Sequence, residues 1–196
     1  REALNDFLKG SFAEDIVAVY FAGHGAPDPD RPRVLYLLTH DSDLNSLGAT
    51  AIKMHDNQDA LRDYVVARTV LVFADACHSR GVSGAVATRG LASTELVNDY
   101  LAELARSRPS TLTFSASDVN QLSQEDLRWG GGHGVFTHYL LEGLKGKANF
   151  DNDNLVRLGE LLQYVTDNVR RETRSQQSPI SSCSYDINLP MSIVIE

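Results

Sequence analysis

Residues 16–22 read Ile-Val-Ala-Val-Tyr-Phe-Ala and are followed by Gly-His-Gly at 23–25. The run is continuously apolar and rich in β-branched and aromatic side chains, which is typical of a strand buried on both faces. Residues 70–74 and 111–114 repeat this pattern. Strands buried on both faces occur in parallel sheets that helices cover on each side. The sequence therefore predicts a central, mostly parallel sheet.

Helical stretches lie between and after these runs, and a more alternating run, residues 33–38, is a further strand candidate. The last helical stretch is the clearest, because its leucines and valines recur at steps of three and four and so share one face. Strands and helices in alternation indicate an α/β fold built in layers. The helices that we predict span residues 59–66, 95–105, 135–144 and 154–174.

The chain has 196 residues, enough for one domain with a substantial core. Its 26 acidic and 18 basic residues give a net charge of −8. This balance argues against a nucleic acid or an anionic membrane as a partner and favours a basic substrate. No apolar run approaches the roughly 18 residues of a membrane span.

Cys77 and Cys183 are the only cysteines, too few for a disulfide scaffold or a zinc site built on thiolates. We therefore expect a reducing compartment, the cytoplasm, and a structural role for Cys183. No signal-peptide pattern follows Arg1. We expect the sequence to be part of a longer chain.

Three residues with reactive side chains come just after predicted strands: His24, Cys77 and Ser115. Ligands of parallel sheets bind at the carboxyl ends of the strands, so these residues are expected at one edge. A nucleophilic Cys needs a base nearby, and His24 could supply it. The N–H groups of Gly25 and Cys77 could stabilise an oxyanion. The simpler interpretation is a buried small Cys and a His in a turn.

The sequence gives less support to a metal site, a serine nucleophile or a phosphate-binding loop. A metal site built from His24, Asp75, Cys77 and His78 lacks the ligand spacing of zinc motifs. A Ser-His-Asp site has no Gly-x-Ser-x-Gly elbow to present the serine. The triple glycine at 130–132 lacks the Lys-Ser/Thr ending of a phosphate-binding loop. We predict no metal site.

The sequences Tyr-Phe-Ala-Gly-His-Gly at 20–25 and Asp-Ala-Cys-His-Ser at 75–79 resemble the His and Cys motifs of the caspase-like cysteine peptidases. The second motif is closer to those of metacaspases and bacterial orthocaspases than to those of animal caspases. Residues 113–117 and 134–137 are weaker matches. The resemblance implies a three-layer α/β sandwich, with a central mostly parallel β-sheet flanked by helices. It also implies one catalytic domain over residues 1–196.

The same resemblance implies a cysteine endopeptidase that needs no metal or organic cofactor. Cys77 is the implied nucleophile and His24 the general base. Asp75 is implied to line the pocket for the residue before the cleaved bond, where a carboxylate pairs with Arg or Lys and repels Asp. Ser115 and Asp118 are further pocket candidates. The other interpretation of Asp75 is a turn or helix-capping carboxylate.

Some features depart from the family pattern. Ala22 stands where metacaspases commonly have Ser. The family's first core strand should precede Arg1, and we expect another domain or chain to supply it. For activating calcium the nearest candidates are Asp41 and Asp43, but loop solvation explains both, so no clear calcium site is predicted.

Regulation by processing is implied too. Residues 81–94 are expected to form a flexible loop directly after the nucleophile, and Arg89 offers a basic cleavage site there. The alternative for Arg89 is a solvated loop arginine. The alternative function for the chain is a catalytically inactive caspase-like module that binds partner proteins. The presence of both His24 and Cys77 argues against it.

Overall fold

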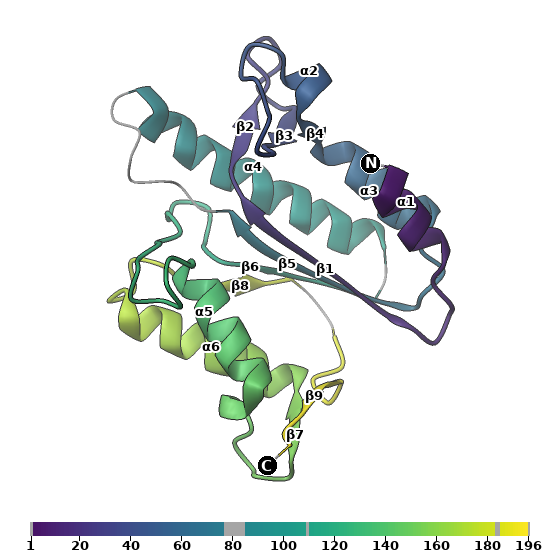
Figure 1. The fold of residues 1–196 in the computed structure, drawn as a ribbon, viewed down its shortest axis with the longest axis vertical. Coiled ribbons are helices and arrows are strands. Elements are labelled where there is room, and N and C mark those ends of the chain that lie inside the picture. Colours follow the sequence, from purple (N-terminus) through teal and green to yellow (C-terminus); the bar gives the residue numbers. More distant parts are fainter. Residues whose placement is uncertain (1, 77–84, 109, 183–184, 196) are drawn as a thin grey trace.

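The computed structural model describes residues 2–76, 85–108, 110–182 and 185–195. Its main sheet consists of Ile16–Gly23 (β1), Thr69–Ala76 (β5), Thr111–Ser115 (β6) and Ile180–Ser181 (β8). The strand order is β1-β5-β6-β8 (Figure 1). The first three strands are parallel, and β8 is antiparallel to β6. All three apolar runs predicted as strands lie in this sheet, and the predicted mostly parallel sheet is confirmed.

Two small antiparallel sheets accompany the main one. The first follows β1 directly and consists of Gly25–Pro27 (β2), Leu35–Leu37 (β3) and Ile52–Lys53 (β4). The strand candidate at 33–38 is therefore confirmed, although β3 is shorter. The second small sheet pairs Leu155–Arg157 (β7) with Pro190–Ile193 (β9).

Helices cover both faces of the main sheet, which confirms the three-layer α/β fold (Figure 1). One layer contains Glu2–Lys9 (α1), Met54–Asp63 (α3) and Ala85–Ser107 (α4). The other contains Val135–Glu142 (α5) and Leu158–Glu172 (α6). A short helix, Leu47–Thr50 (α2), precedes β4, and a π-helical turn, Gly143–Lys147 (η1), continues α5. In the described part of the chain, no helix combines the length and the apolar character that crossing a bilayer demands.

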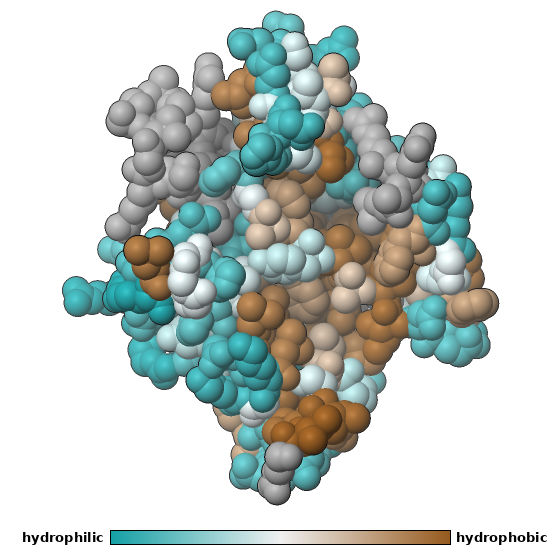
Figure 2. Space-filling view, viewed as in Figure 1, coloured by the Kyte–Doolittle hydropathy of each residue, from teal (hydrophilic) through white to brown (hydrophobic). Residues whose placement is uncertain are grey.

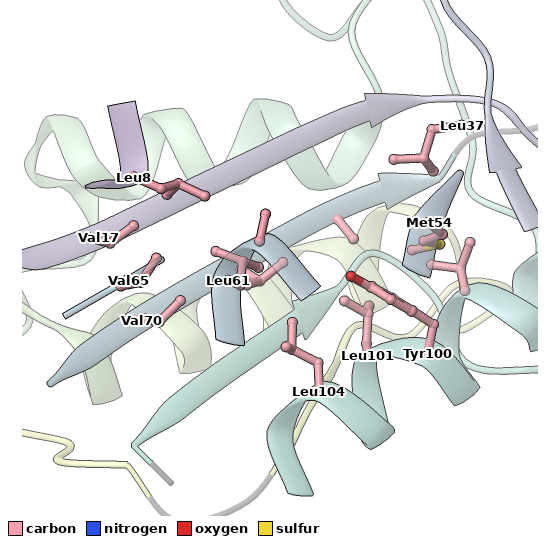
Figure 3. Packing of buried hydrophobic residues seen from close by; sticks show 14 of the residues in the cluster. Leu8, Val17, Leu37, Met54, Leu61, Val65, Val70, Tyr100, Leu101 and Leu104 are labelled. Atoms are coloured by element: carbon pink, nitrogen blue, oxygen red, sulfur yellow. The ribbon is translucent and has the colours of Figure 1, made fainter. Parts of the chain in front are cut away.

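Each layer of helices packs its own hydrophobic core against the sheet. Alternate residues of β5 contribute to the two cores, because successive side chains of a strand point to opposite faces. Val72 lies in the cluster with α1, α3 and α4, which Figure 3 shows in part. Phe73 lies in the cluster with α5 and α6. The sheet is therefore buried on both faces at β5, as its continuous apolar run predicts.

Strand β1 lies at the edge of the sheet, and its two faces differ. Val17 is buried, whereas Ile16 is 45% and Tyr20 48% exposed. Among the described residues, no strand pairs with the outer edge of β1. Figure 2 shows that apolar side chains gather over the middle of the face that it presents. The prediction that residues 16–22 are buried on both faces is therefore wrong for this strand.

The helix predicted at 154–174 is wrong at both ends, since β7 precedes it and α6 ends at Glu172. Glu160 in the first turn of α6 accepts a hydrogen bond from the Arg157 backbone N–H at 2.8 Å, which begins the helix after that residue. Leu155 and Leu158 are three residues apart, so their spacing did not reveal the change from strand to helix.

Three other helices also have bounds that differ from the predictions. Helix α3 begins five residues before the predicted 59–66 and ends at Asp63. Helix α4 begins at Ala85, so the flexible loop predicted at 81–94 is wrong from that residue on. Helix α5 ends at Glu142, and η1 contains Gly146 with a φ of 112°, a value that favours glycine.

Phe136 tests how far the core of α5 supports the fold. Its ring is fully buried and lies 5.0 Å from the ring of Phe114 in an edge-to-face arrangement. Phe136→Ala should lower the free energy of unfolding by about 3–5 kcal/mol. Phe12→Ala, at a side chain that is 71% exposed, should change it by less than about 0.5 kcal/mol. Urea unfolding followed by the fluorescence of buried Trp129 measures both, and equal effects would contradict this packing.

Candidate active site

The carboxyl ends of β1 and β5 lie side by side in register. Gly23 pairs with Ala76, the last pair of eight along the two strands. The next residue after Gly23 is His24, and the next after Ala76 is Cys77. Cys77 lies outside the described residues. His24 is half-buried, and its carbonyl accepts a hydrogen bond from the Leu38 N–H at 2.8 Å. This bond joins the residue to the small sheet.

Gly25 has a defined orientation in that small sheet. It pairs with Leu37, and the bond from Leu38 N–H to the His24 carbonyl flanks this pair. In an antiparallel ladder, this pattern identifies a non-hydrogen-bonded pair. The N–H of Gly25 therefore points away from β3. A donor pointing out of a ladder is what an oxyanion site requires, although its role as such remains a prediction.

Asp75 is buried two residues before Cys77. Its side chain is 1% exposed and faces the first turn of α5. The carboxylate oxygen Oδ2 accepts hydrogen bonds from the backbone N–H of Thr137, at 3.3 Å, and from the Thr137 hydroxyl. A helix N-terminus carries partial positive charge, so this position stabilises a carboxylate.

A third residue extends this network. The Tyr20 hydroxyl lies 2.7 Å from the Thr137 hydroxyl. Because Thr137 donates its one hydroxyl proton to Asp75, Tyr20 donates in this second bond. The chain of hydrogen bonds therefore runs from β1 through α5 to the end of β5.

Gly134 leaves the room that this arrangement needs. A Cβ atom at Gly134 would lie less than 3.0 Å from the Asp75 carboxylate. Any side chain there would displace the carboxylate or the start of α5. The glycine therefore serves the close approach of the helix to Asp75.

The surroundings of Asp75 match a helix-capping carboxylate, which was the other interpretation of this residue. Asp75 and His24 line neither the cavity between β3, α3 and α4 nor the one beside Tyr185 and Leu189. A basic side chain can reach the carboxylate only if the groups packed over it, among them Gly134 and Thr137, move aside. The role of Asp75 in a substrate pocket therefore stays a prediction.

Ser115 and Asp118 do not share the environment of Asp75. Ser115 pairs with Ala74, so its side chain lies on the opposite face of the sheet from Asp75. It is 4% exposed, and its hydroxyl donates to the Ser117 carbonyl at 3.2 Å. Asp118 is half-buried and accepts a hydrogen bond from the Val119 N–H at 2.7 Å. The structure does not bring these three predicted pocket residues together.

Three residues of the site region were not predicted from the sequence, namely Tyr20, Thr137 and Gln177, although the first two lie in the segments 20–25 and 134–137. The Gln177 side chain is fully buried. It donates to the Ala116 carbonyl at 2.9 Å and accepts from the Gln124 N–H at 2.8 Å, so it holds the loop after β6. No local pattern in the sequence signals this contact, because the partners lie 53 and 61 residues away.

The remaining predicted residues lie in loops or in α4. Asp41 accepts a hydrogen bond from the Thr39 hydroxyl, which lowers the pKa of Asp41, and Asp43 accepts from Asn45. Within the described ranges, no group of three or more His, Cys, Asp and Glu side chains could hold a metal ion. Arg89 lies in α4, so cleavage after it would require that part of the helix to unwind.

Thr137→Val should destabilise the protein by about 1–3 kcal/mol, because it leaves a buried carboxylate without one of its donors. Tyr20→Phe should cost about 1 kcal/mol or less, since water can reach its partly exposed surroundings. The control Thr166→Val, at a half-buried position of α6, should change stability by less than about 0.5 kcal/mol. Urea unfolding measures all three. Equal effects of Thr137→Val and the control would exclude a structural role for the network.

The family model of the caspase domain matches residues 1–188, nearly the whole chain. No curated protein matches the sequence.

Proposed function

The chain belongs to the caspase-domain family, a family of cysteine peptidases, and on that basis we propose that it cleaves peptide bonds after Arg or Lys through Cys77 and His24. One observation carries the proposal. Strands β1 and β5 are parallel and end in register at Gly23 and Ala76, and the residues that follow them in the sequence are His24 and Cys77. Adjacent positions in parallel strands allow a base and a thiol to meet.

The proposed reaction has two steps. His24 takes the thiol proton of Cys77, and the thiolate attacks the peptide carbonyl. The N–H groups of Gly25 and Cys77 stabilise the oxyanion, and His24 then gives its proton to the leaving amine. Water attacks the resulting thioester with His24 again as base, which releases the acid and restores the thiol. The reducing compartment expected for this chain keeps the thiol available.

The proposed preference for basic residues depends on Asp75. A carboxylate recognises Arg or Lys by charge-assisted hydrogen bonds and repels an acidic side chain. Its burial at the sheet edge, 1% exposed, would strengthen such a pair relative to one in water. Because α5 covers the carboxylate, we propose that regulation, by processing or by a partner, opens access to it.

The proposed partners are peptides or proteins with Arg or Lys at the cleaved position, together with a domain or chain that pairs with β1. The outer edge of β1 supports the second partner, since no described strand covers it. An open strand edge presents N–H and C=O groups that a further strand can bind. No metal or organic cofactor is required by the proposed chemistry.

The alternative is a catalytically inactive module that binds partner proteins. It would retain the fold and the open edge of β1 but would need neither a thiol at position 77 nor a base at position 24. Hydrolysis of peptides distinguishes the two functions directly.

Cleavage of matched fluorogenic peptides ending in Arg, Lys or Asp tests the proposed dyad. The parent protein should cleave the Arg and Lys peptides, and Cys77→Ala or His24→Ala should lower kcat by about a thousandfold or more. Cys183→Ala is the matched control and should keep full activity. Activity that survives Cys77→Ala would exclude this nucleophile. No cleavage in the presence or absence of calcium would favour the inactive module.

The specificity is tested separately with Asp75→Asn. This change keeps the shape of the side chain but removes its charge, so kcat/KM for Arg peptides should fall by about 10–100-fold relative to uncharged peptides. Thr137→Val keeps the charge of Asp75 and should lower kcat/KM for the Arg peptides and for the uncharged peptides by the same factor. If Asp75→Asn also lowers kcat/KM for the two kinds of peptide by the same factor, Asp75 supports the fold and does not select the substrate.

A further inference from the structure

Near their carboxyl ends, β1 and β5 place Tyr20 and Asp75 on the same face of the main sheet. Tyr20 pairs with Phe73, and Ala22 pairs with Asp75. Paired residues of parallel strands share a face, and so do residues two apart along one strand. Phe73 packs in the core with α5 and α6, which lie together on one side of the sheet (Figure 1). Tyr20 is therefore a diagonal neighbour of Asp75 on the side of α5.

The two strands differ in how far this face is covered. On β5, Phe73 is 5% and Asp75 1% exposed, whereas on β1 Tyr20 is 48% exposed and Ala22 is also exposed. The cover that α5 provides thus ends between β5 and β1. A strand that pairs with the open edge of β1 would lie beside this face and not over it. A side chain that approaches Asp75 along the sheet from β1 therefore crosses Ala22 and Tyr20.

The Tyr20 side chain extends toward the carboxylate. Its hydroxyl lies 2.7 Å from the hydroxyl of Thr137, which in turn donates to Oδ2 of Asp75. A single hydroxyl group therefore separates the end of the Tyr20 ring from the carboxylate. The site thus holds an aromatic ring close to an acidic group. A guanidinium group can bind both, because it donates to a carboxylate and its face is attracted to an aromatic ring.

An arginine side chain fits these two groups better than a lysine side chain does. The guanidinium is planar and weakly hydrated, so it can form two parallel hydrogen bonds to a carboxylate while its face lies on a ring. The ammonium group of lysine is a compact, strongly hydrated charge without such a face. The Asp75 carboxylate attracts both side chains. The Tyr20 ring adds an interaction that favours arginine.

We propose that Tyr20 makes the site beside Asp75 select arginine over lysine. This selection rests on the proposed function, in which the contacts of Asp75 with the start of α5 loosen and the carboxylate binds the residue before the cleaved bond. The guanidinium then takes the place of the Thr137 hydroxyl at Oδ2, and the exposed ring of Tyr20 lies against it. Tyr20 is therefore a specificity residue that contacts the substrate, and its ring matters more than its hydroxyl.

The ratio of kcat/KM for the Arg peptide to kcat/KM for the Lys peptide tests this role. The parent protein should prefer the Arg peptide severalfold. Tyr20→Leu removes the ring and should lower the ratio about three- to tenfold, whereas Tyr20→Phe keeps the ring and should change it by less than about twofold. Both peptides are measured on one preparation, so a loss of folded protein lowers both values and leaves the ratio unchanged.

Tyr64→Leu is the matched control. Tyr64 is 39% exposed and follows α3, before the amino end of β5, so its change should leave the ratio as it is in the parent. An unchanged ratio in Tyr20→Leu would overturn the proposal. Equal falls in Tyr20→Phe and Tyr20→Leu would overturn it too, because the hydroxyl would then act by positioning Asp75 through Thr137.

Binding to the full chain with Cys77→Ala, which prevents turnover, separates this proposal from the peptidase activity. NMR titration with the same Arg and Lys peptides gives affinities that do not depend on catalysis. Adding Tyr20→Leu should lower the ratio of the two affinities about threefold or more. This fall without any cleavage by the parent would support the selection and contradict the peptidase. Cleavage of both peptides with no effect of Tyr20→Leu on either ratio would retain the peptidase and overturn the selection. Absence of both binding and cleavage would overturn both proposals.

Discussion

The parallel pairing of β1 with β5 is the constraint on which the candidate site depends. Their eight pairs keep one register from Ile16 opposite Thr69 to Gly23 opposite Ala76, so both strands end at the same level. A shift of one residue would turn every side chain of β1 to the other face. It would then break the contact of Tyr20 with Thr137 and bury the wrong half of the strand. The register of the sheet therefore determines where the residues of the candidate site lie.

The second requirement is that α5 begins beside the end of β5. The buried Asp75 carboxylate connects the two elements, through the backbone and hydroxyl of Thr137, and Gly134 makes room for it. This position stabilises the fold because the charge lies at a helix N-terminus. It also closes the carboxylate off from solvent. The Asp75 carboxylate therefore contributes to stability in this structure. In the proposed function it also selects a basic substrate, and for that role its contacts with the start of α5 must loosen.

The sequence predicted what depends on local pattern and chain order. The apolar runs predicted the strands β1, β5 and β6. The position of His24 directly after the first run predicted that this residue lies at the carboxyl edge of the sheet. It did not predict contacts between residues distant in the chain, such as Thr137 with Asp75, because a threonine in a first helical turn has many partners available. The start of α4 was missed because the small residues from Ala85 on are typical of loops as well as helices. Ser115 illustrates a further limit, since strand order places it at the correct edge but the register places it on the opposite face from Asp75.

The most direct test of the account is a disulfide cross-link between positions 24 and 77. In a His24→Cys, Cys183→Ser background, parallel strands that continue in the observed register would hold the two Cα atoms about 4.4–6.8 Å apart, the range of native disulfides. Mild oxidation followed by peptide mapping should then give one bond between Cys77 and the introduced cysteine in most molecules. Two free thiols in a folded protein would contradict the central claim that the ends of β1 and β5 bring these positions together.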